Sequence, residues 1–476
     1  MKIIIIGAGI SGCASYLSLQ KHLPQTPGSP HSYAIYEAYD TSRDTTFRER
    51  PATDDTRSAT LVVGGGLGVG ANGLNVLKRL DESLYADVVA GGYPYSNFKL
   101  KSAYGWTLMN VEATADVDGK IMNSVSMSRH SIWQALRDRI PSDVIVNKKI
   151  YRVVLNGGAS GRHLITFTDG SEPVEADLVL GADGLKSTVK RALFDAETAE
   201  DDPYPPQYEG LTGVGGFHPV TPSLRANIPT SSMTITFGGN GFFGYVYSSS
   251  SETDSSRTSA YNMPSPGNTI TWWSTYGAED CPEPKTADKA AMNADLKARH
   301  AHWKDPVIQE IIRDVHVETM WPTWTTPELP MWEREGIVLL GDAAHALPPT
   351  SGQGSAQALE DVECFSLFLK HHLERVYTQN PAGDGQGVSQ AEREAIQVAA
   401  KKYMALRMPR VKAILDEARQ RQQGKKNMNV VQEFVMYLIL WLVGCFAPAN
   451  PAKPILEYNM AEEVRKVLAE EDNETK

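Results

Sequence analysis

Three glycines near the amino terminus have the spacing that a nucleotide-binding turn needs. Gly7, Gly9 and Gly12 form a GxGxxG pattern that directly follows the apolar run 2–6 and directly precedes the helix-like stretch 13–22. In such a turn the first glycine permits the tight bend, the second lets the backbone approach a pyrophosphate, and the third allows the helix to pack closely on the strand. The helix then presents N–H groups and its positive dipole end to the phosphates.

An acidic residue ends the next predicted strand. Glu37 follows residues 33–36, where a carboxylate can accept hydrogen bonds from both ribose hydroxyls. A carboxylate there disfavours a 2′-phosphate, so the site suits an ADP-ribose rather than NADPH. A GxGxxG pattern alone also fits a purely structural glycine turn. The strand, the helix and the acid together favour cofactor binding.

A second turn carries one acid followed by two bases. The sequence GADGLKSTVKR covers residues 181–191 and follows a short apolar strand. Asp-Gly pairs are common turn formers, so Asp183 taken alone fits an ordinary turn. Lys190 and Arg191 follow closely, and their charge could stabilise a bound anion.

A third motif places an acid and two glycines after another strand. Asp342 lies in GDAAH, where its carboxylate can accept a hydrogen bond from a ribitol hydroxyl. Gly352, Gly354 and Ser355 follow, and they would let a helix N-terminus point its amides at the pyrimidine edge of a flavin, where the reduced ring carries negative charge. His345 in the same turn fits a structural hydrogen-bonding group better than a catalytic base.

The elements that must position these residues form two α/β stretches around a β-rich one. Between about residues 192 and 330, short alternating segments such as SMTITFGG and NTITWWSTY are separated by Ser, Pro and Gly clusters. After Gly336 an apolar strand restores the α/β pattern, and helical spacing dominates from residue 355 to the end. The sequence therefore predicts an α/β protein with a discontinuous, three-layer Rossmann-like cofactor domain (1–190 and 331–385), an inserted β-sheet substrate domain (191–330) and a C-terminal helical region (386–476).

Composition excludes several classes of protein. The chain has 476 residues, 41% of them hydrophobic and 22% charged, which fits an ordinary globular protein of more than one domain. The net charge of -11, with scattered Lys and Arg, argues against a nucleic acid partner. The four cysteines lie far apart without a CxxC pair, and glycines interrupt the first apolar run too early for a signal peptide. We therefore expect a cytoplasmic protein.

One apolar segment near the C-terminus allows two interpretations. Residues 434–447, FVMYLILWLVGCFA, are almost wholly apolar but are fewer than the ~20 that a spanning helix needs. Segments of this length are usually core, so a buried helix is favoured. The alternative is a helix that lies on a membrane surface, with the protein peripheral to that membrane.

The three motifs, in this order and at these separations, resemble those of the single-component FAD-dependent monooxygenases, the group that includes p-hydroxybenzoate hydroxylase and many fungal secondary-metabolite hydroxylases. The resemblance covers about residues 1–425. It implies non-covalent FAD, with Asp183 contributing to FAD and reductant binding and Asp342 contacting the ribitol. Arg129 resembles the family arginine that opens a helix and pairs with the flavin nucleotide. Gly65 and Gly66, in the stretch 64–72, resemble the segment that lies along the isoalloxazine.

The resemblance also implies a reaction. NAD(P)H would reduce the FAD, O2 would add to give a flavin hydroperoxide, and one oxygen atom would pass to an organic small molecule in secondary metabolism. Electrophilic transfer favours an electron-rich aromatic, indole or enolic substrate, and Arg191 or Lys190 could stabilise its phenolate. Several fungal relatives use a tyrosine about 30 residues after the basic position; here YEGLTGVGGF has no tyrosine at the expected spot, only Tyr208 earlier and Phe217 later. The candidates to line the substrate pocket are aromatic, although each taken alone fits plain core better: Phe237, Phe242, Phe243, Trp272, Trp273 and Trp321.

Two other functions fit the same motifs. An epoxidase or a Baeyer–Villiger-type oxygenase would use the same fold, and its products would distinguish it from a hydroxylase. A flavin-binding protein without turnover belongs to a different class. Rapid reduction of its FAD by NADPH in the presence of a ligand would exclude a passive carrier.

Overall fold

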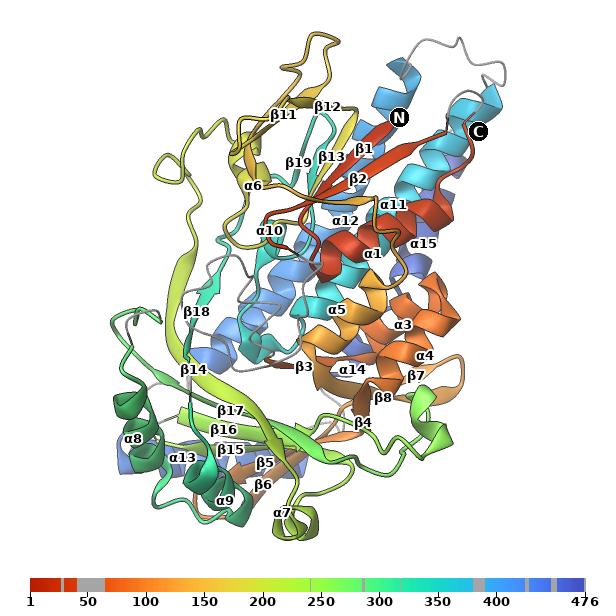
Figure 1. Cartoon of the computed structure of the whole chain (residues 1–476). Coiled ribbons are helices and arrows are strands. Elements are labelled where there is room, and N and C mark those ends of the chain that lie inside the picture. Colours follow the sequence, from red (N-terminus) through yellow and green to blue (C-terminus); the bar gives the residue numbers. More distant parts are fainter. Residues whose placement is uncertain are drawn as a thin grey trace.

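The computed structural model describes residues 1–26, 30–40, 65–239, 241–284, 287–317, 319–379, 390–423, 428–446 and 452–474. Within these residues the chain forms an α/β part, drawn at the top of Figure 1, and a large β-sheet with its own helices, drawn at the bottom. This is the mixed α/β architecture that the sequence predicts.

A six-stranded sheet forms the centre of the α/β part. Its strand order is β19-β20-β13-β1-β2-β9, and all neighbours are parallel except the pair β19 and β20. Ile3, Ile4 and Ile5 in the central strand are fully buried, which explains the unbroken β-branched run, because a strand covered on both faces has no polar side. The strands are β1 (Lys2–Ile6), β2 (Ser32–Glu37), β9 (Ile145–Asn147), β13 (Leu178–Gly181), β19 (Glu333–Arg334) and β20 (Ile337–Leu339).

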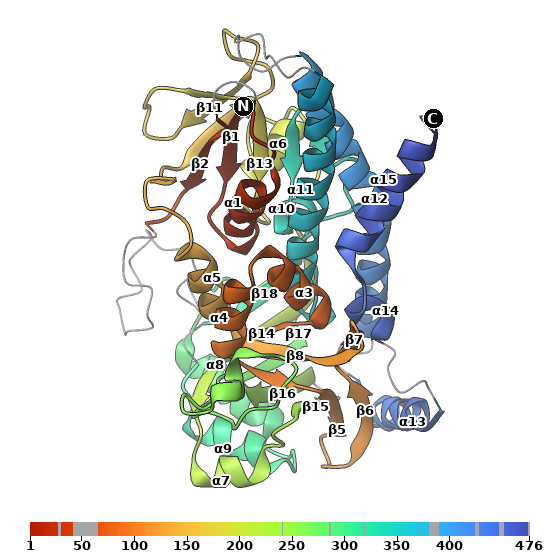
Figure 2. The same cartoon turned by 90° about the vertical axis from the view of Figure 1, so that its right-hand side faces the viewer.

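Helices cover one face of this sheet and a small antiparallel sheet covers the other, which gives the three layers predicted (Figures 1 and 2). The helical layer contains α1 (Ile10–His22), α11 (Gly354–Gln379), α12 (Gln390–Gln423) and α15 (Met460–Glu474). The opposite layer contains β10 (Ile150–Val154), β11 (His163–Phe167), β12 (Val174–Ala176) and the short helix α6 (Thr188–Leu193).

The second part is a seven-stranded sheet of order β18-β14-β17-β16-β15-β5-β6. Its strands β5 (Asn97–Ser102) and β6 (Thr107–Glu112) come from the segment assigned by sequence to the cofactor domain, and β5 pairs in parallel with β15. The seven-stranded sheet therefore takes strands from outside the predicted substrate domain, residues 191–330. The other strands are β14 (Gln207–Pro219), β15 (Ser232–Gly238), β16 (Gly241–Tyr247), β17 (Thr269–Gly277) and β18 (Trp321–Thr325).

A four-stranded sheet and three helices connect the two parts. The sheet contains β3 (Gly66–Val69), β4 (Gly92–Tyr95), β7 (Thr114–Val117) and β8 (Lys120–Ser128), and the helices are α3 (Ala71–Leu80), α4 (Glu82–Ala90) and α5 (Arg129–Arg137). The lower face of the seven-stranded sheet is covered by α7 (Pro222–Asn227), α8 (Lys289–His300) and α9 (Pro306–Asp314). The short helices α10 (Asp342–His345) and α14 (Lys453–Leu456) are also labelled in the figures.

The apolar segment near the C-terminus forms helix α13 (Val430–Phe446), which lies against β6 at the edge of the seven-stranded sheet (Figure 2). The favoured prediction of a buried helix is wrong, because Tyr437 is its only buried side chain. Ala447 lies outside the described residues.

A buried histidine lies beneath the seven-stranded sheet. His300 ends α8, is fully buried, and places Nε2 2.8 Å from the hydroxyl oxygen of Ser274. Burial, with the charge of Arg299 adding to it, lowers the pKa of His300 from 6.5 to about 3. The unfolded chain therefore binds a proton near pH 6.5 that the folded chain takes up only near pH 3, so His300 destabilises the fold as the pH falls between these values.

When the pH falls from 7 to 5, protonation of His300 in the unfolded chain is expected to lower the free energy of unfolding by about 2 kcal/mol. Urea unfolding of the wild type and of His300→Gln at both pH values measures it, because glutamine does not titrate. His302→Gln is the control, since His302 is exposed and lies close by in sequence. Equal loss of stability with falling pH in wild type and His300→Gln would contradict the assignment.

Candidate cofactor site and active site

Four of the residues singled out by sequence meet at the carboxyl edge of the six-stranded sheet. Strands β1, β2, β13 and β20 run parallel, and Gly7, Glu37, Asp183 and Asp342 lie at or just beyond their carboxyl ends. In open α/β sheets ligands bind at this edge. The fold therefore brings the three motifs together, although more than 300 residues separate the first from the last.

The three glycines of the first motif have different surroundings. Gly7 has a φ of +103°, and a Cβ there would lie 2.4 Å from the carbonyl oxygen of Ala182. A Cβ at Gly12 would lie 1.9 Å from the carbonyl oxygen of Gly7, so helix and turn pack closely there. A Cβ at Gly9 would meet no atom within 4 Å. The fold itself requires Gly7 and Gly12, whereas Gly9 faces open space at the start of α1.

Glu37 lies beside this turn. Its carboxylate accepts a hydrogen bond from the backbone N–H of Ala8 at 2.7 Å and another from that of Tyr39 at 3.1 Å. Burial raises the pKa of Glu37, and the hydrogen bonds from the backbone partly oppose that rise. The carboxylate is thus fixed at the end of β2, next to the start of α1, as a ribose-binding acid requires.

Asp183 directs its carboxylate toward its own chain. It accepts hydrogen bonds from the hydroxyl of Ser187 and from the backbone N–H groups of Thr188 at 2.7 Å and Val189 at 3.3 Å. These bonds cap the N-terminus of α6. Burial raises the pKa of Asp183, and the same hydrogen bonds act against the rise. The carboxylate therefore shapes the turn, and a ligand here would meet the turn's backbone, where Gly184 has a φ of +75° and open space in place of a Cβ.

The two bases of this motif have different contacts. The ammonium of Lys190 is buried, lies 2.8 Å from the carboxylate of Asp202 and donates to the carbonyl of Tyr204. These contacts contradict a substrate-binding role for Lys190, because they use its charge inside the fold. Arg191 is partly exposed, and its guanidinium donates to the hydroxyl of Thr188 at 3.1 Å, at the start of α6. Arg191 is therefore the base of this pair that remains a candidate for contact with substrate.

The third motif leaves an acid and two glycines facing open space. The carboxylate of Asp342 makes no hydrogen bond or ion pair with the described part of the chain, although Gly341 before it is packed against Ser11. Gly352 has a φ of +62°, and a Cβ at Gly352 or at Gly354 would meet no atom within 4 Å. Helix α11 begins at Gly354, so Ser355 lies in its first turn and the amides there point toward this space.

A further open glycine lies beside an arginine. The carbonyl of Gly65 accepts the backbone N–H of Arg129, which opens α5, and a Cβ at Gly65 would again meet no atom within 4 Å. The Arg129 guanidinium makes no hydrogen bond or ion pair with any residue that the structure describes. A Cβ at Gly66 would lie 2.1 Å from the hydroxyl oxygen of Thr271, so β3 touches the seven-stranded sheet. Gly64 lies outside the described residues.

A buried polar network supports the third motif from behind, and sequence reasoning missed it. Arg407 of α12 is fully buried and contacts Asp361 at 2.8 Å, Glu360 at 2.6 Å and the side-chain oxygen of Gln357 at 2.7 Å, all on α11. Nε2 of His345 lies 2.6 Å from the Asp361 carboxylate, which fits the structural role expected of this histidine.

The charges of this network oppose the cost of burying its acids. Burial alone would raise the pKa of Asp361 and of Glu360, but the charges of His345 and Arg407 on the former, and of Arg407 and Arg410 on the latter, hold both below their usual values. Asp361 also accepts the backbone N–H of Gly341 at 2.9 Å. The network thereby fixes α10, α11 and α12 relative to one another around the glycines of the third motif. The signal in the sequence is the stretch YMALRMPRV, residues 403–411, which carries two arginines in an otherwise largely apolar segment.

The aromatic candidates fall on two faces of the seven-stranded sheet. Phe243 and Trp272 stack on each other, with ring centroids 5.4 Å apart, in the core beneath the sheet. Neighbouring residues of a strand point to opposite faces, so Trp273 lies on the upper face with Thr271, which touches β3. The Trp273 indole lies across Gly244, where a Cβ would be 2.1 Å from it.

The remaining aromatic candidates follow the same alternation. Phe237 and Phe242 pair with each other on the upper face, with ring centroids 6.0 Å apart. Trp321 lies on the edge strand β18. The prediction that Phe243 and Trp272 line a substrate pocket is therefore wrong, because the helices α7 to α9 cover their face of the sheet.

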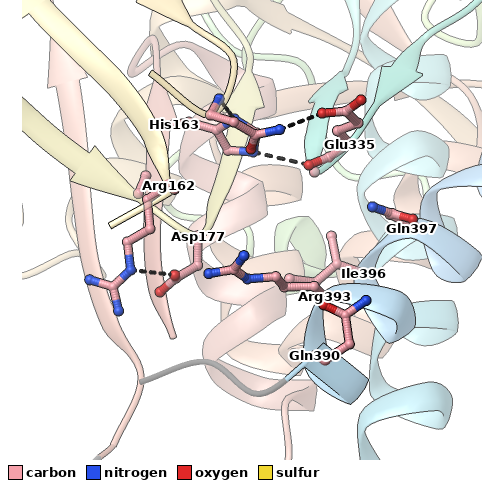
Figure 3. A pocket seen from close by; sticks show the side chains of 12 residues that line it. Arg162, His163, Asp177, Glu335, Gln390, Arg393, Ile396 and Gln397 are labelled. Carbon is pink, nitrogen blue, oxygen red and sulfur yellow. Dashed lines mark hydrogen bonds and ion pairs between the residues drawn. The ribbon is translucent and has the colours of Figure 1, made fainter. Parts of the chain in front are cut away.

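One cavity of about 320 Å³ lies at the other edge of the six-stranded sheet (Figure 3). Asp177 precedes β13 there and forms an ion pair with Arg162 at 2.7 Å. In the same cavity wall, Nε2 of His163 lies 3.1 Å from the backbone carbonyl oxygen of Glu335. This is the amino edge of the parallel strands. Because ligands of such sheets bind at the carboxyl edge, this cavity is not the cofactor site.

The carboxyl edge fits FAD in the distribution of its open positions. Gly9, Gly65, Gly352 and Gly354 all have open space where a side chain would be. They come from three separate segments around one edge of the sheet, since Gly352 and Gly354 belong to the same motif. With Glu37 at the first segment, and with Asp342 and Arg129, whose side chains have no partner among the described residues, at the others, the donors and acceptors suit a ribose, a ribitol and a phosphate. Loaded with FAD, the protein would use the chemistry of the bound flavin, which the chain orients and shields.

Comparison with known proteins agrees with this geometry. The family model "FAD binding domain" matches residues 156–401. The chain is 30% identical over 224 residues to 6-hydroxynicotinate 3-monooxygenase of Bordetella bronchiseptica, covering 47% of this chain and 51% of that protein. It is 24% identical to salicylate hydroxylase of Pseudomonas putida over 78% of this chain and 76% of that one. The match thus spans about half the length of 6-hydroxynicotinate 3-monooxygenase.

Solved structures show the same fold. Klebsiella pneumoniae HpxO, complexed with FAD and uric acid, superposes with a TM-score of 0.66 over 93% of each chain at 19% identity. The family match over more than half of the chain, the shared fold and the open carboxyl edge lead to one conclusion: this protein belongs to the FAD binding domain family, which groups FAD-dependent monooxygenases of the p-hydroxybenzoate hydroxylase type.

Proposed function

We propose that this protein is an FAD-dependent monooxygenase that transfers one oxygen atom of O2 to an electron-rich aromatic, indole or enolic small molecule. NAD(P)H serves as the transient reductant, and secondary metabolism is the setting. The relatives support the reaction class, since they are named as a 3-monooxygenase of 6-hydroxynicotinate and a hydroxylase of salicylate. Reduced FAD supplies the reaction with O2, while the chain binds and orients the substrate and excludes water.

The upper face of the seven-stranded sheet is the observation that carries this proposal. Thr271 touches β3 next to the open Gly65, and Trp273 lies two residues further along the same face of β17. Trp273 packs with Met233 and Val246 but remains partly exposed. An apolar, aromatic wall facing a flavin suits a flat substrate with few charges.

Arg191 is the basic residue proposed to act on the substrate. Its guanidinium points back along α6 to Thr188, close to the turn at Asp183. A positive charge there would stabilise the phenolate or enolate that makes a ring carbon electron-rich.

A screen of the purified, FAD-loaded protein tests the function. NADH and NADPH oxidation are followed with phenols, indoles and cyclic enols, under ¹⁸O2, and products are identified by mass. One ¹⁸O atom incorporated per product supports a monooxygenase. An epoxide or a ring-expanded lactone would assign a different oxygenation on the same fold. NAD(P)H oxidation with release of hydrogen peroxide and no product for any substrate class would count against the proposal.

Adjacent tryptophans provide a matched pair of variants. Trp273→Leu is expected to raise KM for an accepted aromatic substrate about tenfold with little change in stability, because it removes one stacking surface. Trp272→Leu is expected to lower the free energy of unfolding by about 3 kcal/mol and to leave KM nearly unchanged, because Trp272 is buried on the other face. Steady-state kinetics and urea unfolding measure both. A larger change of KM in Trp272→Leu would reverse the assignment of faces.

A further inference from the structure

The outward face of α13 carries most of the exposed large apolar side chains among the described residues. Its exposed side chains are 39 to 83% accessible, and none of residues 434–446 is charged. These side chains are Val431, Phe434, Val435, Leu438, Ile439, Trp441, Leu442, Val443 and Phe446. Helices at protein surfaces normally turn their polar side to water, and this one turns its apolar side outward. Exposed apolar patches of this kind mark sites of association.

Two aromatic residues of the β5–β6 turn extend this surface. Tyr104 and Trp106 are 42 and 53% exposed, and their rings stack with centroids 5.4 Å apart. The ring of Phe434 lies 5.3 Å from that of Tyr104 and 6.1 Å from that of Trp106. We call Tyr104, Trp106 and the outward side chains of α13 the α13 surface. It combines aliphatic side chains with amphipathic Tyr and Trp rings, as membrane–water interfaces do.

The inner side of α13 holds the helix in this orientation. The hydroxyl of Tyr437 donates to the carbonyl of Phe237 at 2.7 Å and accepts the backbone N–H of Ala103 at 3.2 Å. Gly444 approaches β6 so closely that a Cβ would lie 2.9 Å from the carbonyl oxygen of Leu108. These contacts fix the helix along the sheet edge, so it cannot rotate its apolar side inward without breaking them.

We propose that the α13 surface docks this protein on the face of a lipid bilayer, with α13 parallel to the membrane plane. A helix of 17 residues is about 26 Å long and would insert its outer side chains about 5 to 10 Å into the headgroup and acyl boundary. No helix among the described residues is long and apolar enough to cross a membrane.

The size of the surface favours a bilayer over a second copy of the chain. A stable protein interface takes about 20 to 30 residues from each partner and has a rim of polar groups. The α13 surface offers about half that number and, across residues 434–446, no charged side chain for such a rim. Binding to a bilayer requires neither that many contact residues nor a polar rim. The net charge of -11 disfavours attraction to anionic lipid, so the binding is apolar in origin.

Flotation of the FAD-loaded full chain with neutral phosphatidylcholine vesicles tests the proposal. We expect the wild type to float with the vesicles, equally in 0.1 M and 1 M salt, because salt does not screen apolar contacts. Leu438→Glu combined with Leu442→Glu should weaken partitioning at least about 100-fold. Val398→Glu combined with Tyr151→Glu is the matched control, since these exposed residues lie on α12 and β10 in the α/β part of the chain and should leave partitioning unchanged.

Quenching of tryptophan fluorescence by brominated phosphatidylcholine locates the contact. The quenching should fall in Trp441→Phe and Trp106→Phe and stay unchanged in Trp324→Phe, an exposed tryptophan on β18. The proposal is overturned if the folded wild type stays with the vesicle-free fraction. It is also overturned if, without lipid, the wild type is a dimer that the Leu438 and Leu442 substitutions convert to a monomer, because a second copy would then cover the surface.

Discussion

Arg407→Met is expected to lower the free energy of unfolding by about 3 to 5 kcal/mol. Arg407 is fully buried, and its guanidinium contacts two acids and one amide on α11. Methionine fills a similar volume but leaves Glu360 and Asp361 buried with fewer partners. Breaking a buried ion pair lowers stability by more than the intact pair contributes to it, because the remaining charge stays buried without a compensating partner.

Urea unfolding of the apoprotein measures this effect, and a second ion pair on the same helix supplies the control. Lys412 of α12 lies 2.6 Å from Glu328, and both side chains are about half exposed. Lys412→Met should change the free energy of unfolding by less than about 1 kcal/mol, as exposed pairs do. The double variant Arg407→Met, Asp361→Asn should lose less free energy of unfolding than the sum of the two single variants, because both substitutions remove the same ion pair. Additive costs would mean that the two side chains do not act together.

The fold was predictable where sequence pattern and burial coincide. The run of isoleucines in 2–6 and the helical spacing after Gly9 are local signals, and they gave the central strand and helix. The three-layer architecture followed from the order of the motifs. The boundaries of the predicted substrate domain could not be predicted in this way, because β5 and β6 join a sheet whose other strands begin at residue 207. Pairing between such distant segments gives no signal in the local sequence.

The candidate site was predictable where backbone geometry needs a particular residue. Glycines with positive φ or with no room for a Cβ, such as Gly7 and Gly12, are required by the turn itself. Side-chain partners were harder to predict. Lys190 and Arg191 are adjacent and chemically alike, yet one points to Asp202 and the other to the start of α6. Neighbouring side chains of a helix point in directions about 100° apart, so Lys190 and Arg191 meet different surroundings. Which of the two points into the fold depends on how α6 packs, and the local sequence does not determine that.

The same difficulty applies to the sheet and to α13. Alternation along β17 shows that Trp272 and Trp273 face opposite ways, but which of them lies on the face that touches β3 depends on where α7 to α9 pack. For α13, an apolar stretch of this length usually means a buried helix. Here one side is attached to the sheet edge through Tyr437 while the rest is exposed, which composition cannot reveal.

Gly9→Val is expected to give a folded protein that binds FAD at least about 100-fold more weakly and has lost the proposed monooxygenase activity at ordinary FAD concentrations. A Cβ at Gly9 meets no protein atom within 4 Å, and the residue has ordinary backbone angles with a φ of -74°. The fold therefore tolerates the change, at a cost of about 1 kcal/mol for a poorer helix N-cap. The valine side chain would occupy the space that the FAD pyrophosphate needs.

Thermal unfolding with and without added FAD separates a lost site from a lost fold. FAD should raise the Tm of the wild type, because a ligand that binds only the folded state stabilises it, and should leave the Tm of Gly9→Val unchanged. The apoproteins should have similar Tm values. Gly12→Ala makes the contrast, because its Cβ would lie 1.9 Å from the backbone oxygen of Gly7 and should disrupt the fold itself. Wild-type affinity for FAD in a folded Gly9→Val protein would place the pyrophosphate elsewhere, and the open glycines at the carboxyl edge would then need a different ligand.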